Sequence, residues 1–240
     1  MGSVKKLVLV IAALVLGACG NGRLVSPADR VVHHVISGPA YVEPDLFRTA
    51  QFAPPPALDT EAQKADLAAV LAWQSRRTAA DCSRSRTTAD ANYDYFWGDK
   101  PPFPFPSPLP AEVKAFFTRL DYDTGEALNV MKKRFARLRP FKQYDEVRPC
   151  IRKSSGYSYP SGHASYSRVF AEVLGDIVPA RRGEFLKRAD EVASDRVVGG
   201  VHYPTDIAAG KEFGEQFHAE LLKSRAYRED VEHMKAFVSE

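Results

Sequence analysis

The chain has 240 residues, of which 45% are hydrophobic and 26% are charged, so it is long enough for one large domain or two small ones. Its formal net charge is +3, and two of its lysines fall in an N-terminal segment that we expect to be removed. The remaining charges nearly cancel, which argues against a protein that coats a polyanion and against nucleic-acid binding.

The first 19 residues have the pattern of an export signal. Lys5 and Lys6 form a basic start, and residues 7–16 form an apolar run that is too short to span a bilayer. The sequence LGAC at residues 16–19 then resembles a bacterial lipoprotein cleavage box, which would make Cys19 the lipidated N-terminus. The alternative is an ordinary secretory signal that is cut just before this cysteine. In both cases we expect an exported protein, periplasmic or attached to the outer membrane.

Residues 20–58 are rich in proline, glycine and small polar residues, and the sequence FAPPPA at residues 52–57 cannot form a helix. We therefore expect a Pro-rich irregular arm here. From residue 59 to residue 240 apolar residues recur at helical spacing and strand patterns are nearly absent, which predicts a compact single-domain helical bundle of the all-α class. The predicted helices cover residues 61–79 with Thr60 as the cap, 88–97, 110–120, 124–138, 162–178, 179–194, 204–222 and 225–238, and a rigid proline-rich loop covers 101–110.

Two cysteines remain after the signal. In an oxidising compartment Cys82 and Cys150 are expected to form a disulfide, and the alternative is two unpaired buried thiols. The sequence holds no CxxC, no HExxH and no His/Cys cluster at zinc spacing. We therefore predict no metal held by the protein.

The sequence Tyr159-Pro-Ser-Gly-His163 is typical of a tight turn that opens a helix, because Pro160 ends what precedes it and Gly162 permits unusual backbone geometry. The free N–H groups and the positive dipole end of such a helix bind anions. Ser161 and His163 would then lie in an anion site, with His163 as a proton donor. The alternative is a capped helix that carries a surface histidine.

A basic segment precedes this turn. Lys132 and Arg139 stand seven residues apart, which is two helical turns, so we expect both cations to project to one side of a helix that Pro140 ends. The alternative is an ordinary solvated basic face.

A second histidine follows in the segment from Arg196 to Asp206. Pro204 is suited to the first position of a helix, so Asp206 would lie in the first turn. His202 precedes Asp206 by four residues, close enough for the carboxylate to accept the imidazole Nδ1–H and leave Nε2 free as a nucleophile. The alternative is a pair that only caps the helix.

Together these blocks resemble the signature of the type 2 phosphatidic acid phosphatase superfamily, which includes bacterial class A non-specific acid phosphatases and vanadium haloperoxidases. The signature reads Lys, six residues, Arg-Pro; then Pro-Ser-Gly-His; then Ser-Arg, five residues, His, three residues, Asp. The one departure is Asp195, which stands where the signature has serine, and it puts that serine's hydrogen bond in doubt. The matching residues are Lys132, Arg139, Pro140, Pro160, Ser161, Gly162, His163, Arg196, His202 and Asp206.

The resemblance implies the helical fold of these enzymes and a metal-independent acid phosphatase with a broad range of phosphomonoester substrates and no cofactor. It implies that His202 forms a phosphohistidine, that Asp206 orients it and that His163 is the general acid. It assigns the phosphoryl oxygens to Lys132, Arg139, Ser161, Gly162 and Arg196. If His163 titrates near its ordinary value, activity is expected to be highest at about pH 5–6.5.

Three alternatives remain at this point: a vanadate-dependent haloperoxidase, a surface-tethered lipid or isoprenoid pyrophosphate phosphatase, and a non-catalytic phosphate-binding lipoprotein. Small-molecule phosphomonoesters are the expected partners. We expect no nucleic acid and no membrane contact beyond the lipid anchor, and the sequence leaves the oligomeric state open.

Overall fold

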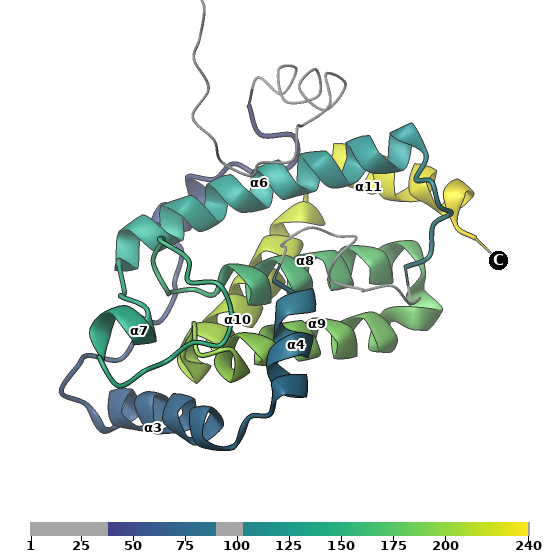
Figure 1. Cartoon of the computed structure of the whole chain (residues 1–240). Coiled ribbons are helices and arrows are strands. Elements are labelled where there is room, and N and C mark those ends of the chain that lie inside the picture. The colour runs from purple at the N-terminus through teal and green to yellow at the C-terminus, as the bar shows by residue number, and fades with distance from the viewer. Residues whose placement is uncertain (1–37, 90–102, 240) are drawn as a thin grey trace, which may run out of the picture. The chain divides into compact units, whose positions relative to one another are not determined.

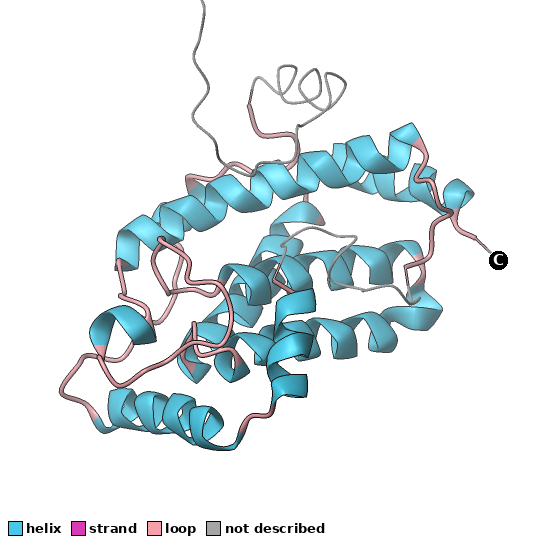
Figure 2. Ribbon diagram, in the orientation of Figure 1, coloured by secondary structure: helices cyan, strands magenta, loops and turns pink. Residues whose placement is uncertain are grey.

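The computed structural model describes residues 38–89 and 103–239, and within these ranges every regular element is a helix (Figures 1 and 2). The all-α class predicted from the sequence is therefore confirmed. The export signal with Cys19, the first part of the arm and most of the helix predicted at 88–97 lie outside the described residues. The elements are α2 (Leu46–Thr49), α3 (Glu61–Arg76), α4 (Ala79–Thr87), α6 (Ala111–Phe135), α7 (Pro140–Gln143), α8 (Gly162–Ile177), η1 (Pro179–Arg181), α9 (Arg182–Val198), α10 (Pro204–Leu221), α11 (Arg225–Met234) and η2 (Lys235–Phe237).

The helix predicted at residues 61–79 ends at Arg76, and a second helix that was not predicted, α4, begins at Ala79. Thr60 caps α3 as predicted, since its side chain accepts a hydrogen bond from the Gln63 backbone. The chain then turns at Arg77, and Thr78 starts α4 with a capping box in which the Asp81 carboxylate accepts from the Thr78 backbone N–H at 2.8 Å. This local cap ends the longer helix, and Thr88, where the next helix was predicted to begin, instead caps the end of α4.

A single helix, α6, replaces the two that were predicted at 110–120 and 124–138. No proline or glycine interrupts the chain between these ranges, so the helix continues through Asp123. The helix ends when Ala136 adopts a left-handed conformation with φ 47°. The prediction that Lys132 and Arg139 share one helix is therefore wrong: Lys132 lies in the last turn of α6, whereas Arg139 caps α7 and Pro140 begins that helix.

The described part of the arm packs against α6 through a buried carboxylate. Asp123 accepts backbone hydrogen bonds from Ala40 at 3.0 Å, Tyr41 at 2.7 Å and Val42 at 3.1 Å. Phe47 of α2 is buried against the rings of α10. The arm is irregular apart from α2, so its backbone donors are satisfied by a side chain instead of by a sheet or a longer helix.

Helix α8 forms the centre of the bundle and packs against both α9 and α10, while α6 runs along another side of the group (Figure 1). Ten of the 16 residues of α8 are buried, which is the burial expected of a central helix. The main core joins α6, α8, α9, α10 and α11, and a smaller apolar cluster lies under α3 and contains Val70, Val147, Ala164, Ala193, Val197, Tyr203 and Ile207.

A disulfide joins Cys82 of α4 to Cys150, which lies in the loop between α7 and α8. The two cysteines are 68 residues apart in sequence, so the bond closes a long loop and restricts the unfolded chain. Helix α4 is thereby fixed to the loop that precedes the Ser161 turn.

Helices α8 and α10 approach each other closely at Gly210. A Cβ atom at this position would lie 2.6 Å from the Ala164 Cβ and 2.8 Å from the Ser161 carbonyl oxygen. Those distances are below van der Waals contact, so any side chain here would push the start of α8 away.

We expect Gly210→Ala to lower the free energy of unfolding by about 1–3 kcal/mol, because the added methyl group overpacks the α8–α10 contact. Urea unfolding would measure the change. Gly183→Ala is the matched control, since a Cβ atom at Gly183 in α9 would meet no atom within 4 Å. Equal stability changes in the two variants would contradict the close approach.

Candidate active site

Six segments bring the residues of the three sequence blocks together at one end of the bundle. Lys132 comes from the end of α6 and Arg139 from the cap of α7. Ser161 caps α8, and Gly162 and His163 begin it. Arg196 lies near the end of α9, His202 lies in the loop that follows, and Asp206 is in the first turn of α10. The contacts below connect these segments to one another.

The His202 imidazole lies between a carboxylate and a guanidinium. Its Nδ1 is 3.1 Å from Asp206 Oδ2, and its Nε2 is 3.0 Å from Arg139 Nη1. Both His202 and Asp206 are fully buried. Since Asp206 accepts at Nδ1 and Arg139 donates at Nε2, the contacts select the neutral tautomer with the lone pair on Nε2.

The charges around this pair favour a neutral imidazole beside an ionised carboxylate. Burial, followed by the charge of Arg139, lowers the pKa of His202 to about 3. Burial alone would raise the pKa of Asp206, but the bond from His202 and the charge of Arg137 outweigh it and hold that pKa below its ordinary value. His202 is therefore an uncharged potential nucleophile at neutral pH.

Lys132 and Arg139 lie close enough to the His202 imidazole to lower its pKa, and Arg196 lies close to Arg139 and to His163. Burial lowers the pKa of Lys132 to about 7, with the charge of Arg139 as the second cause. It also lowers the pKa values of Arg139 and Arg196 to about 10, and Arg139 contributes to the shift of Arg196. Cations that lower one another's pKa are crowded together, so this cluster favours an anionic ligand.

Backbone carbonyls hold these cations in place. Lys132 Nζ donates to the Pro160 oxygen at 2.7 Å and to the Tyr157 oxygen at 3.0 Å. Arg139 donates to the oxygens of Gly156 at 2.9 Å and Val201 at 3.0 Å. Carbonyls are neutral, so they orient the cations while leaving most of their charge for a ligand.

The turn before α8 lies against the same groups. Ser161 N–H donates to the Asp206 backbone oxygen at 3.0 Å, and the Ser161 hydroxyl accepts from the Ala164 backbone. Gly162 faces Lys132, whose Cε would lie 3.9 Å from an added Cβ. The start of α8 is therefore joined to the start of α10, and the lysine reaches across it.

The pKa of His163 differs from the value expected from the sequence. Its Nε2 lies 2.9 Å from the Ala89 carbonyl oxygen. Burial, followed by the charge of Arg196, lowers the pKa of His163 to about 3 instead of leaving it near the ordinary value. An imidazole so close to three cations is neutral until a negative charge arrives.

The sequence analysis missed a buried network behind Asp206. Arg137 donates to Asp206 Oδ1 at 2.7 Å, to Asp66 Oδ2 at 2.7 Å and to Gln63 Oε1 at 2.6 Å. Ser158 donates to Asp206 Oδ2 at 2.5 Å. Arg137 lies between Lys132 and Arg139 in the basic segment, and its position beyond the end of α6 gave no sign that it turns inward.

Asp195 also has a place in the structure. It is buried at the end of α9, where Arg84 Nε donates to its Oδ1 at 2.9 Å and the Thr88 hydroxyl donates to its Oδ2 at 3.1 Å. The neighbouring Arg196 donates to Thr88 Oγ1 at 2.6 Å. Asp195 is thus joined to the arginine of the site through α4 and the residue that caps it.

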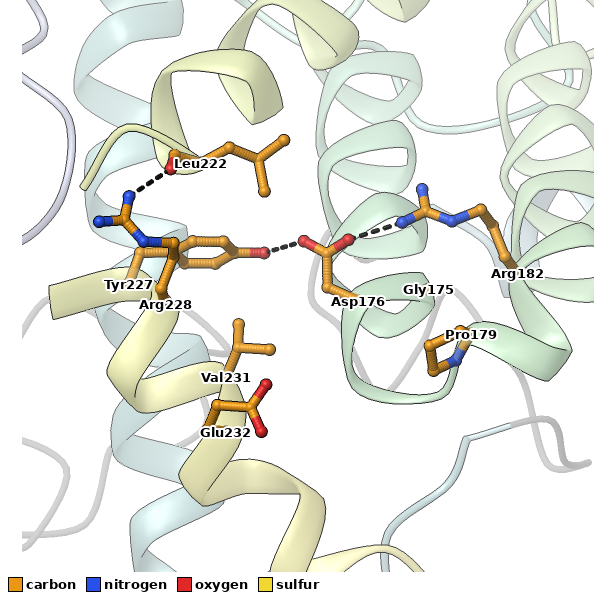
Figure 3. A pocket seen from close by; sticks show the side chains of 9 residues that line it. All are labelled: Gly175, Asp176, Pro179, Arg182, Leu222, Tyr227, Arg228, Val231 and Glu232. Atoms are coloured by element: carbon orange, nitrogen blue, oxygen red, sulfur yellow. Dashed lines mark hydrogen bonds and ion pairs between the residues drawn. The ribbon is translucent and has the colours of Figure 1, made fainter. Parts of the chain in front are cut away.

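A separate surface pocket of about 500 Å³ lies where α8 and α11 meet (Figure 3). Asp176 accepts there from Arg182 at 2.6 Å, from Tyr227 at 2.7 Å and from His218 at 2.7 Å. The charged groups that line this pocket have partners in it or beside it, and none of the predicted site residues lines it.

Comparison with known proteins agrees with the motifs. Residues 123–229 match the family described as the PAP2 superfamily, in agreement with the resemblance that the motifs show. A non-specific acid phosphatase of Providencia stuartii is 34% identical over 106 residues, and one of Salmonella typhi is 35% identical over 106, in each case 42% of both chains. A lipid A 1-phosphatase of Rhizobium johnstonii is 32% identical over 98 residues, which are 39% of this chain and 40% of that one. The matches span about two fifths of these curated relatives.

Solved structures share the fold. A bacterial vanadium-dependent iodoperoxidase superposes with a TM-score of 0.51 at 18% identity, over 76% of this chain and 53% of that one. A bacterial vanadium-dependent chloroperoxidase gives 0.52 at 14% identity, over 79% and 52%. The predicted fold type is therefore confirmed, and at these identities the likeness concerns the fold alone.

Two further findings concern the described ranges only. None of the helices in residues 38–89 and 103–239 is long and apolar enough to cross a membrane. In the same ranges no group of three or more His, Cys, Asp or Glu side chains is arranged to hold a metal ion.

We expect Arg137→Met to lower the free energy of unfolding by about 3–5 kcal/mol, because it leaves two buried carboxylates without their cation. Arg137→Lys keeps the charge but not the fork that reaches both carboxylates, so an intermediate loss is expected. Urea unfolding would measure both. Arg225→Met is the control, since Arg225 pairs with Glu229 on an exposed surface. A loss no larger than in the control would contradict the role of Arg137.

The lowered pKa values also predict how stability depends on pH. Between about pH 6.5 and pH 3 the unfolded chain binds protons on His163 and His202 that the folded protein does not, so stability falls by up to about 1.4 kcal/mol per pH unit for each histidine. We expect His163→Asn to show a smaller loss than the native chain between pH 6.5 and 4. Inorganic phosphate should reduce the native loss. If the free energy of unfolding, measured with urea, falls equally with pH in the native chain and in His163→Asn, the burial of a neutral His163 is contradicted.

Proposed function

We propose that this protein is a metal-independent acid phosphatase that hydrolyses a broad range of phosphomonoesters through a phosphohistidine. The observation that carries the proposal is a neutral, buried His202 that is held by Asp206 and lies near Lys132 and Arg139, with Arg196 near Arg139 and His163. Such a pocket attracts a negatively charged phosphoryl group and presents a nitrogen lone pair to its phosphorus atom. The acid phosphatase names of its relatives support the same reaction.

In the first step His202 Nε2 attacks phosphorus, a nitrogen–phosphorus bond forms and the bond to the ester oxygen breaks. Arg139, which contacts Nε2 in the ligand-free site, transfers its hydrogen bond to a phosphoryl oxygen. Asp206 stabilises the positive charge that develops on the imidazole. Arg196 supports this assignment because its buried Nε has no partner among the described residues and can donate to a second phosphoryl oxygen.

His163 transfers a proton in both steps, first as the general acid and then as the general base. Burial and the neighbouring cations keep His163 neutral, so we assign the proton for the leaving oxygen to the substrate, whose negative charge raises the pKa of His163 once it is bound. In the second step His163 removes a proton from water, whose oxygen attacks phosphorus and releases His202. With this assignment the reaction is expected to be faster at acidic pH, because the phosphomonoester then carries one proton more than at neutral pH.

The central test is to trap the intermediate with a ³²P-labelled aryl phosphate followed by quenching at alkaline pH. We expect an acid-labile label on the native protein that is lost in His202→Ala. His163→Ala should slow turnover of p-nitrophenyl phosphate on the order of 10²–10⁴-fold. EDTA should have no effect, and orthovanadate should inhibit.

The exposed His233 of α11 provides the matched control, so His233→Ala should keep native turnover. Label retained in His202→Ala would contradict the assignment of the nucleophile. Phosphate binding without turnover in the native protein would support the non-catalytic alternative, and loss of activity in EDTA would contradict the metal-independent reaction.

A lipid phosphatase is the second candidate, because one relative is named a lipid A 1-phosphatase. A panel that compares aryl, sugar and nucleotide phosphates with lipid phosphates in detergent separates the two, and we expect the soluble esters to be preferred. Bromide oxidation by peroxide with added vanadate tests the haloperoxidase alternative, and we expect none.

For the whole protein we propose export and a lipid anchor on Cys19, with residues 1–19 as signal, 20–58 as arm and 59–240 as the catalytic domain. The support is the sequence of the N-terminal 19 residues. Metabolic labelling with palmitate should mark the native protein and not Cys19→Ser. Label on both would contradict the anchor.

A further inference from the structure

The end of α4 meets the guanidinium of Arg196. Arg196 is 2% exposed, and its Nη2 donates to Thr88 Oγ1 at 2.6 Å and to the Ser85 carbonyl oxygen. Thr88 in turn donates to Asp195 Oδ2 at 3.1 Å. A relay therefore runs from a carboxylate through a hydroxyl to the arginine, and every member of it is buried.

The Asp195 carboxylate determines which groups donate and which accept in these hydrogen bonds. A hydroxyl has one hydrogen and two lone pairs, so Thr88 can accept from Arg196 without conflict only when its hydrogen is directed elsewhere. Asp195 is acceptor-only when ionised and takes that hydrogen. A serine at this position, as in the motif that the sequence resembles, can itself donate and does not impose the direction.

A carboxylate this close to an anion site would repel the ligand unless its charge were balanced. Arg84 supplies the balance, with its Nε 2.9 Å from Asp195 Oδ1 and about half of its side chain exposed. The hydrogen bond to Asp195 raises the pKa of Arg84 above its ordinary value. The pair is therefore close to neutral toward a bound phosphate, while the orientation of Thr88 is kept.

We propose that Asp195, Thr88 and Arg84 form a positioning unit that fixes the Arg196 guanidinium for phosphate binding, in place of the serine of the motif. This inference rests on the proposed function, because it assigns Arg196 to the phosphoryl oxygens. None of the three residues contacts the substrate; they act through Arg196.

The same segment also reaches the second histidine. Ala89, two residues beyond α4, contacts His163 Nε2 through its carbonyl oxygen at 2.9 Å. The disulfide between Cys82 and Cys150 fixes the middle of α4. A displacement of α4 would therefore affect Arg196 and His163 together.

The test is direct binding of inorganic phosphate to the full chain by calorimetry, with turnover of p-nitrophenyl phosphate measured in parallel. We expect Thr88→Val and Asp195→Ala each to weaken phosphate binding roughly 10-fold, because each removes the oriented acceptor of Arg196. Asp195→Asn keeps an acceptor oxygen for Thr88, so binding should stay within about 3-fold of native.

A double variant tests whether Arg84 balances the charge of Asp195. Arg84→Met leaves Asp195 unbalanced and should weaken phosphate binding about 5-fold, and adding Asp195→Asn should restore it, because the repelling charge is gone. A salt bridge that served stability alone would not show this restoration. Circular dichroism and thermal unfolding show whether each variant is folded, and Thr88→Val carries the test if Asp195→Ala is not.

Asp190→Asn is the matched control, since Asp190 lies on the same helix and pairs with Arg168 and Lys211. We expect native binding in this variant. If the native chain binds phosphate and Thr88→Val and Asp195→Ala bind equally well, the positioning unit is overturned while the proposed function stands. If the native chain neither binds phosphate nor turns over the ester, both are overturned.

Discussion

The carboxylate of Asp206 is the interaction on which the rest of the site depends. It receives hydrogen bonds from the His202 ring, the Arg137 guanidinium, the Ser158 hydroxyl and the backbone of Tyr203. These donors come from separate parts of the chain, so one buried charge joins them. A buried carboxylate is unfavourable unless its partners are complete, and the network that satisfies it therefore also fixes the position of the imidazole.

The same residue links the site to the fold. The backbone oxygen of Asp206 accepts from Ser161, so the start of α10 is tied to the start of α8, and the absence of a side chain at Gly210 lets the two helices come this close. A site that is held by packed helices is more accurately positioned than one on free loops. The geometry of His202 relative to the Ser161 turn is thus a consequence of helix packing.

The buried cations differ in whether their partners are carboxylates or neutral groups. Arg137 is fully compensated by Asp66 and Asp206 and supports the structure, whereas Lys132 and Arg139 are held by neutral carbonyl oxygens. Arg196 lies between these cases, with Thr88 as its partner and a buried Nε that is unpaired within the described ranges. The arrangement separates cations that stabilise the protein from cations that are available to a ligand.

The sequence by itself determined the helical class, the turn at Ser161, the start of α10 at Pro204 and the residue types of the site, because these depend on local propensities and short spacings. It misplaced the end of α3 and the relation of Lys132 to Arg139, since a capping box and a single left-handed residue decide them. Only the tertiary structure decided that Arg137 turns inward, that burial lowers the pKa of His163 and that Asp195 contacts Thr88. Each of these depends on burial and on charges that lie far apart in the chain, and local sequence contains neither.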